Sequence, residues 1–443
     1  MPVNRGGQVP SSEEVDIGLS TLPSTEFSLT PTRRMERGCC KDVQSPTRFT
    51  LTILFVILIL ISLVCVIVVF LEIGGAINMG PPCESSKAEH SISDVILEND
   101  GVFGKTTDGK SIESFTFKNK NKMEVTVLTY GGTISRILVP DREGNLDDVT
   151  LGFDTLADYE GSNNPYFGCI VGRYANRIGG GTFSIDGVTY NTPKNDGDNS
   201  LHGGIEGFNK KVWDAKMDDD TLVLTYVSVD GEEGFPGQLT TQVTYKLTNQ
   251  NEIVITFEAT TTQATPISLT NHAYFNLAIR DSNVPTIYDH QVSINAARYT
   301  PVDSGLMGLI PTGELATVSG TLFDLKTSTM LSERINDIPG GGYDHNFCIN
   351  GPTGRKVAAR VEHAASGRVL EVFTNQPGMQ FYTGNFLGGF AGKSGANYTR
   401  HTGFAMEPQT YPDSPNKANF PDAILHPGST YNHEMTYKFS VKA

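Results

Sequence analysis

Short runs in which apolar and polar residues alternate fill most of the chain after residue 95. Side chains of a strand point alternately to its two faces, so such runs are typical of half-buried strands. In the run TQVTYKL, for example, Val243, Tyr245 and Leu247 would share one face. The clearest runs lie at residues 112–118, 123–129, 133–139, 222–229, 241–247, 253–259, 369–374 and 431–439.

The spacing of these runs predicts one large all-β domain over residues 95–443. Turn-forming sequences such as Asp186-Gly187 and Asp230-Gly231 separate the runs, as expected between antiparallel strands. No long stretch carries the apolar stripe of a regular helix, and no repeat of fixed period occurs. The pattern favours a sandwich or barrel of many strands without an internal linker.

A different pattern occupies residues 50–71, where apolar residues follow one another without a charge. Only Thr50, Thr52 and Ser62 are polar in this run. A helix over the 21 residues 51–71 would be about 31 Å long, close to the roughly 30 Å core of a bilayer. A cleaved signal peptide would have a shorter apolar core and a small-residue cleavage site. The run is therefore predicted to be a single transmembrane helix with the lipid bilayer as its partner.

Flanking charge predicts the orientation of this helix. Basic residues cluster shortly before it, whereas the first basic residue after it is Lys87. The positive-inside rule then places the N-terminus in the cytosol and the large domain in the lumen or outside the cell. We expect residues 1–49 to be a disordered cytosolic tail and residues 72–94, which are rich in glycine and proline, to be a stalk.

This topology suggests two modifications. Cys39 and Cys40 adjoin the membrane on the cytosolic side, where S-palmitoylation is a hypothesis beside a reduced, unmodified pair. Asn397 begins an N-glycosylation sequon, Asn-Tyr-Thr, which is usable only if the domain is luminal.

The remaining cysteines do not form a dense disulfide framework. Cys83 in the stalk has no evident partner, so an intermolecular bridge is a further hypothesis. Cys169 and Cys348 lie in apolar contexts, which predicts buried core thiols.

Charge excludes one class of partner. The net charge is −15, and acidic and basic residues balance within residues 1–49, so the acidity belongs to the rest of the chain. Nucleic-acid binding needs a basic surface that displaces counterions, so we expect no nucleic-acid partner.

Four polar segments within the β-rich region could carry chemistry: NSLHGG at 199–204, TNHAYFNL at 270–277, YDHNF at 343–347 and FAMEPQTYPD at 404–413. Taken singly, each has an ordinary structural explanation, since a histidine beside aromatic residues is commonly a core residue. The histidines lack the spacing of a zinc motif, and no nucleotide-binding loop or nucleophile elbow occurs. We expect no metal and no cofactor.

Taken together, the segments closely resemble the aldose 1-epimerase (galactose mutarotase) family. The resemblance covers about residues 95–441. It also includes GRYANRI at 172–178, Gly207-Phe208 with Trp213, NQPGMQFYTGN at 375–385, and Pro412-Asp413 with Asn416. It implies an antiparallel β-supersandwich and an isomerase of free aldohexoses such as galactose and glucose.

The same resemblance implies roles for individual residues. His272 matches the general acid and Glu407 the general base. One small departure from the family pattern is Pro408, which we expect to stiffen the loop that carries Glu407. The residues matched to sugar binding are His202, Arg177, Asp344 and Gln380, with Asn176 beside Arg177 in the same site.

Mutarotation requires one proton to leave the anomeric hydroxyl and one to reach the ring oxygen. We expect the carboxylate and the imidazole on opposite sides of the ring, with the histidine protonated near neutral pH.

Three other functions stay open at this stage. A hexose-6-phosphate 1-epimerase would need cations for phosphate, and the motifs supply only Arg173 and Arg177. A membrane-tethered sugar receptor would commonly lack the acid or the base, and both are present. A glycoside hydrolase would need a second carboxylate beside Glu407, for which only Asp344 is available. The preferred sugar, the membrane and the oligomeric state are not set by the sequence.

Overall fold

The computed structural model describes residues 95–279, 285–303 and 309–442 of the 443-residue chain. Within these residues no helix is long and apolar enough to cross a membrane. The predicted tail, transmembrane helix and stalk lie outside the described residues, as do Cys39, Cys40 and Cys83. The predictions for these segments and cysteines are therefore not tested by the structure.

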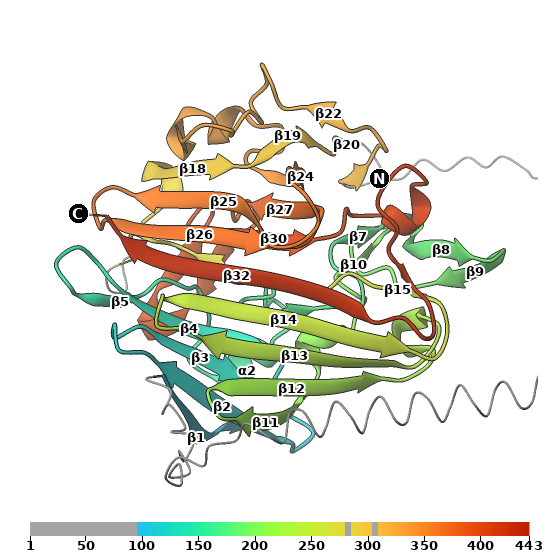
Figure 1. Ribbon diagram of the computed structural model, residues 1–443, viewed down its shortest axis with the longest axis horizontal. Coiled ribbons are helices and arrows are strands. Elements are labelled where there is room, and N and C mark those ends of the chain that lie inside the picture. The colour runs from blue at the N-terminus through green and yellow to red at the C-terminus, as the bar shows by residue number, and fades with distance from the viewer. Residues whose placement is uncertain (1–94, 280–284, 304–308, 443) are drawn as a thin grey trace, which may run out of the picture. The chain divides into compact units, whose positions relative to one another are not determined.

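The described residues form three main antiparallel sheets (Figure 1). In the largest, the C-terminal strand β32 lies between β14 and β26 and so joins two groups of strands that are far apart in sequence. Its nine strands are, in order, β11 (Asp214–Asp218), β12 (Thr221–Ser228), β13 (Leu239–Leu247), β14 (Glu252–Thr261), β32 (Tyr431–Val441), β26 (Arg368–Thr374), β25 (Lys356–His363), β18 (His290–Ile294) and β23 (Thr329–Met330).

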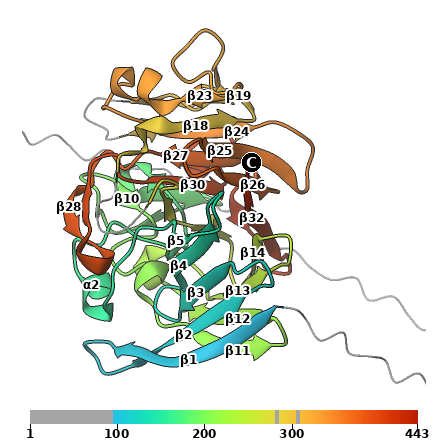
Figure 2. The same cartoon turned by 90° about the vertical axis from the view of Figure 1, so that its left-hand side faces the viewer.

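Two smaller sheets cover the two halves of this nine-stranded sheet, as the turned view shows (Figure 2). The five-stranded sheet comprises β1 (Ile96–Lys105), β2 (Ser111–Lys118), β3 (Glu124–Leu128), β4 (Thr133–Pro140) and β5 (Leu146–Asp148). The six-stranded sheet comprises, in order, β17 (Tyr274–Phe275), β30 (Phe404–Gln409), β27 (Gly378–Tyr382), β24 (Asp344–Ile349), β19 (Ala296–Tyr299) and β22 (Ala316–Thr317).

Short paired strands complete the fold, and α2 (Leu156–Glu160) is the α-helix of the described residues. The pairs are β6 (Ile170–Val171) with β16 (Thr270–Asn271), β7 (Arg177–Ile178) with β10 (Ser200–Leu201), β8 (Thr182–Ile185) with β9 (Val188–Asn191), β15 (Thr265–Pro266) with β31 (Ile424–Leu425), β20 (Val302–Asp303) with β21 (Ile310–Pro311), and β28 (Gly388–Ala391) with β29 (Asn397–Thr399).

One apolar core fills the space between these layers, and alternation in the sequence builds it. Val243, Tyr245 and Leu247 are all buried, as their shared face predicts. Phe117 from the five-stranded sheet and Phe381 from the six-stranded sheet join the same core. The predictions of an all-β domain and of the individual strands are confirmed.

The cysteine prediction is confirmed in part. Cys169 is buried, but Cys348 on β24 is only partly buried, so its interpretation as a core thiol was wrong. Its apolar neighbours Phe347 and Ile349 point to the core instead, because residues of a strand alternate between its faces.

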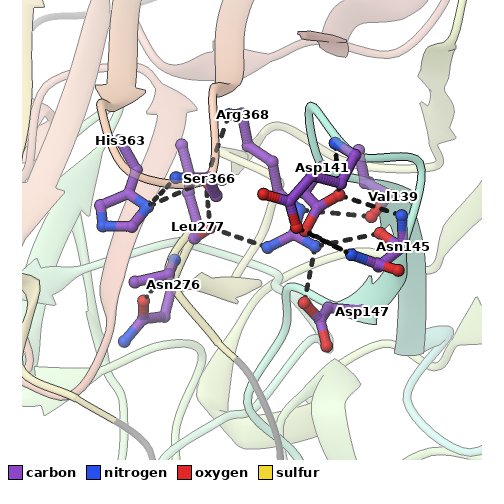
Figure 3. A network of polar contacts seen from close by, with 11 residues as sticks. Val139, Asp141, Asn145, Asp147, Asn276, Leu277, His363, Ser366 and Arg368 are labelled. Atoms are coloured by element: carbon purple, nitrogen blue, oxygen red, sulfur yellow. Dashed lines mark hydrogen bonds and ion pairs between the residues drawn. The ribbon is translucent and has the colours of Figure 1, made fainter.

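A buried arginine ties the layers together (Figure 3). Arg368, the first residue of β26, is 0% exposed. Its guanidinium donates to the carbonyl oxygens of Val139 (3.2 Å) and Leu277 (3.1 Å) and to the Asp147 carboxylate (2.6 Å). Val139 and Asp147 belong to the five-stranded sheet, while Leu277 ends the segment that carries His272. One side chain thus holds that segment against two sheets.

Candidate active site

Three of the predicted site residues come from neighbouring strands of the six-stranded sheet. Asp344 opens β24, Gln380 lies in β27 and Glu407 lies in β30. Gln380 pairs directly with Glu407 across the ladder. The Nε2 of Gln380 donates to Oδ1 of Asp344 at 2.6 Å. Because paired residues of adjacent strands point to the same side, the sheet itself sets the spacing of these side chains.

Two short strand pairs bring in the other residues. The pair β7–β10 places Arg177 and His202 together, with Asn176 just before β7. The backbone N–H of Asn176 donates to Nδ1 of His202 at 3.2 Å, and Oδ1 of Asn176 accepts from the Arg177 backbone N–H at 2.9 Å. Since Nδ1 of His202 accepts a hydrogen bond, Nε2 of the neutral ring carries the N–H that a ligand would meet.

Glycines next to His202 permit this close packing. Gly203 has a φ of +90°, and a Cβ there would overlap the backbone carbonyl of Gly172. Asn176 and His202 also adopt left-handed φ angles of 63° and 53°. Such conformations are uncommon outside glycine and concentrate at functional sites.

His272 follows β16 and meets Glu407 at the bottom of a cavity of about 170 Å³. Its Nε2 lies 3.5 Å from Oε1 of Glu407, and the two side chains are 5% and 2% exposed. Among the described residues, Nδ1 of His272 and Oε2 of Glu407 have no hydrogen-bond partner. Six of the seven predicted site residues line the cavity, and Gln380 instead holds Asp344 from the side.

Arg177 lies at the wall of this cavity between two carboxylates. Its Nε donates to Oδ2 of Asp196 at 2.7 Å, and its Nη1 is 4.0 Å from Oδ2 of Asp344. Sequence reasoning did not find Asp196, which carries no motif of its own. Arg173, by contrast, is turned away from the cavity. It is buried and donates to Ser228 and to backbone carbonyls, so the expectation that it is a cation of the cleft was wrong.

Aromatic side chains that the sequence reasoning missed form much of the rim: Tyr166, Tyr274, Tyr382 and Phe386. The ring of Tyr274 stacks on His272 with centroids 5.0 Å apart. Phe386 is largely exposed beside the opening. Tyr382 could have been inferred, because it lies two residues after Gln380 on β27 and so points to the same side.

Burial governs the protonation of the acid and the base. It lowers the pKa of His272 to about 4, because the charged imidazolium would lose its hydration. Burial also raises the pKa of Glu407 well above its usual value, and the negative charge of Asp344 adds to this rise. The expectation that His272 is protonated near neutral pH in the free site was therefore wrong. The pKa of His202 is lowered too, mainly by burial.

Two imidazoles and a carboxylate converge here. One ligand atom each from His202, His272 and Glu407 lie within 4.8 Å of one another. Two histidines and a glutamate are a ligand set that zinc accepts, although sequence spacing gave no sign of it. The same three groups can equally transfer protons and donate hydrogen bonds, so the two chemistries need a direct test.

Comparison with known proteins decides the family. Residues 113–438 match the family described as Aldose 1-epimerase. The chain belongs to the aldose 1-epimerase family.

The chain matches relatives in this family over nearly the full length of each relative. The galactose mutarotase of Bos taurus is 47% identical over 342 residues, which are 77% of this chain and 98% of that protein. The aldose 1-epimerase of Escherichia coli is 37% identical, over 75% of this chain and 96% of that protein. Among solved structures, an aldose epimerase homologue from C. elegans has a TM-score of 0.68 at 31% identity, and covers 73% of this chain and 97% of its own.

Proposed function

We propose that the protein is an aldose 1-epimerase that interconverts the α and β anomers of free aldohexoses such as galactose and glucose. The observation that carries this function is the contact of His272 Nε2 with Glu407 Oε1 at 3.5 Å in the small cavity that both side chains line. The names of the relatives, galactose mutarotase and aldose 1-epimerase, support the same activity.

The geometry corrects the expected placement of the acid and the base. Two groups 3.5 Å apart cannot lie on opposite sides of a pyranose, so that expectation was wrong. They can instead address two neighbouring oxygens. The anomeric hydroxyl and the ring oxygen are both bonded to C1, and adjacent proton-transfer groups suit adjacent oxygens.

Ring opening then requires one proton to be removed and one to be added. In the roles implied by the family, Glu407 takes the proton of the anomeric hydroxyl while His272 delivers one to the ring oxygen. The C1–O5 bond breaks, the aldehyde rotates about C1–C2, and O5 attacks its other face. During closure the two residues exchange roles, so the site returns to its initial protonation state.

The opposed pKa shifts of His272 and Glu407 suit this chemistry. Between the lowered pKa of the imidazole and the raised pKa of the carboxyl, the pair holds one proton in total. One proton on two groups supplies one acid and one base, whichever group carries it in the empty site. Contact with a sugar hydroxyl can move the proton between the two groups, because they titrate as a coupled pair.

This pair predicts the dependence of kcat/KM on pH. Below about pH 4 the pair gains a second proton and loses its base, because the pKa of His272 is about 4. Above the raised pKa of Glu407 it loses its last proton and its acid. We expect a bell-shaped profile with a broad plateau between these limits, measured by polarimetry after subtraction of the spontaneous rate.

The variant Asp344→Asn tests the cause of the alkaline limit. Removing this negative charge lowers the pKa of Glu407, so the alkaline limb should move to lower pH. An alkaline limb that stays in place or moves upward would contradict the assignment. The position of the limb is informative even if substrate binding weakens.

The cavity walls support binding of an unphosphorylated sugar. Arg177 and the Nε2–H of His202 can donate to sugar hydroxyls, and Asp344 can accept from them. Because Arg173 is engaged elsewhere, Arg177 is the one arginine that lines the cavity within the described residues, and it already meets two carboxylates. A sugar phosphate would bring two negative charges to this acidic site, so the hexose-6-phosphate reaction is disfavoured.

The function is tested by assaying the purified chain on α-galactose, α-glucose, xylose, arabinose and glucose 6-phosphate. Catalysed mutarotation of galactose or glucose is the expected result. A protein that binds sugar without accelerating mutarotation would be a receptor and would refute the proposal. Dialysis against EDTA should leave the rate unchanged, because both protons move directly between side chains and sugar oxygens. A loss restored by zinc would instead assign His202, His272 and Glu407 to a metal.

We also propose that residues 50–71 anchor the enzyme in a membrane, with the N-terminus in the cytosol and the catalytic domain in the lumen or outside the cell. The support is the uncharged apolar run and the basic residues before it. Asn397 is exposed on β29, which suits its predicted glycosylation. In sealed vesicles the catalytic domain should resist protease until detergent is added, and release of the protein by alkaline carbonate would contradict an anchor.

A further inference from the structure

A second cavity lies on the five-stranded sheet. It has a volume of about 310 Å³ and adjoins another of about 570 Å³. The two share Arg136, Asp148, Asp154 and Lys393, so they form one continuous depression, which we call the β1–β4 cleft. Each part is larger than the catalytic cavity of about 170 Å³. None of the residues predicted for the catalytic site lines it.

Buried hydroxyl groups form the floor of this cleft. On β2 and β3, Phe115, Phe117 and Val125 face the apolar core. The opposite face of the same strands and of β4 carries four hydroxyl side chains, which are buried although they line a cavity: Ser114, Thr116, Thr126 and Ser135. A sheet face that was simply open to solvent would leave such groups exposed, and an ordinary packed face would be apolar.

Two β-bulges aim side chains into this floor. Asp100 is the extra residue where β1 slips against β2, and Ser135 is the extra residue where β4 slips against β3. Both line the cleft. Oδ2 of Asp100 accepts from the hydroxyl of Thr116 at 2.6 Å, and that hydroxyl is 2.9 Å from the hydroxyl of Thr126. Bulges commonly redirect side chains next to binding sites.

The opposite wall comes from the hairpin β28–β29. Nζ of Lys393 forms an ion pair with Oδ2 of Asp148 at 2.7 Å. The next residue, Ser394, donates its backbone N–H to Asp154 at 2.7 Å. The loop of the hairpin is therefore fixed at two points, to β5 of the five-stranded sheet through Asp148 and to the segment that follows β5 through Asp154.

Charges in the cleft largely cancel. Lys393 is paired with Asp148, and Nη2 of Arg136 lies 3.2 Å from Glu124. Nε of Arg136 has no hydrogen-bond partner among the described residues, and the side chain is 43% exposed, so a ligand can reach this guanidinium. Asp100 and Asp154 already accept hydrogen bonds through Oδ2, and their Oδ1 atoms remain as acceptors, so the cleft does not favour an anion. Donors, acceptors and hydroxyls interleave with the rings of Phe103 and Phe153, a combination suited to sugar hydroxyls and to the apolar C–H face of a pyranose.

We propose that the β1–β4 cleft binds a neutral oligosaccharide of two or more sugar units. The volume exceeds that of the site for a single sugar, and the balanced charge excludes a phosphorylated or sulfated ligand. The β1–β4 cleft shares no lining residue with the catalytic cavity. A chain of aromatic contacts nevertheless runs from the cleft to His272. Phe153 contacts Phe167, which contacts Tyr274, the ring stacked on His272 (centroids 5.2, 5.0 and 5.0 Å apart).

The test measures binding by the full chain in a detergent without a sugar headgroup. Neutral oligosaccharides of two to four units, including lactose and maltotriose, are titrated by calorimetry and saturation-transfer NMR. Saturating galactose is present to fill the catalytic cavity. We expect at least one oligosaccharide to bind under these conditions. Absence of binding by every member of the panel, or full displacement by galactose, would overturn the proposal.

Two variants locate the binding. Arg136→Met removes the unpartnered Nε–H, and Thr126→Val removes a floor hydroxyl with little change of shape. Each should weaken oligosaccharide binding, by about tenfold or more for the charged donor. Arg355→Met is the control, because Arg355 is similarly exposed and is also paired with a glutamate, at 3.1 Å. Mutarotation of galactose should be unchanged in all three, which also shows that they fold. Unaltered oligosaccharide binding in both cleft variants would refute the site.

Discussion

Glu407→Gln should lower kcat for galactose mutarotation by about 10²–10⁴-fold, which is the usual contribution of one proton-transfer group. The side chain is 2% exposed and the amide has nearly the same shape, so the fold should persist. The amide cannot accept the hydroxyl proton, and His272 then has no partner for the exchange of roles. Polarimetry on freshly dissolved α-galactose measures the loss.

The control for this variant is Glu258→Gln, which changes an exposed glutamate on β14 and should leave kcat unchanged. His272→Asn should cause a loss similar to that of Glu407→Gln. The double variant should be about as slow as the slower single variant, because groups that act as a unit give non-additive effects. A kcat for Glu407→Gln within about threefold of the parent would reject the acid–base assignment.

Arg368→Met should lower the free energy of unfolding by about 3–5 kcal/mol, the usual result of removing one partner of a buried ion pair. The variant leaves Asp147 without its cation and removes one donor each from the carbonyls of Val139 and Leu277. The network in Figure 3 shows why the effect should be large, since it joins two sheets and the segment after His272. Urea unfolding followed by circular dichroism measures the change.

Arg355→Met again supplies the comparison, because that arginine is exposed and each of its ion pairs, with Glu252 and Glu434, is expected to contribute at most about 1 kcal/mol. If both variants lost a similar small amount of stability, Arg368 would not be the joint between the layers.

The alternating strands could be predicted from the sequence because one face of each is buried in the shared core. Val243, Tyr245 and Leu247 show this directly, since each is buried as its position in the run requires. The order of the strands could not be predicted. Nothing in residues 431–439 indicates that this last strand enters the centre of the largest sheet, because pairing depends on partners that are distant in sequence.

The site was predictable as a set of residues but not as an arrangement. Resemblance to a family identified His272 and Glu407, yet their adjacency follows from β16 and β30 meeting in space. Arg173 and Arg177 lie four residues apart in one motif, and only the fold shows that Ser228 and backbone carbonyls occupy the first of them. The low pKa of His272 likewise depends on burial, which the local sequence does not contain.

The contact between the imidazole and the carboxylate has a consequence for what the enzyme can achieve. The same two groups serve ring opening and ring closure, and after each cycle both have regained their initial protonation states. Such a catalyst has no means to favour one anomer, so the final ratio is that of the uncatalysed solution. The enzyme changes only the rate of interconversion. When another reaction consumes one anomer, that anomer is therefore replenished sooner.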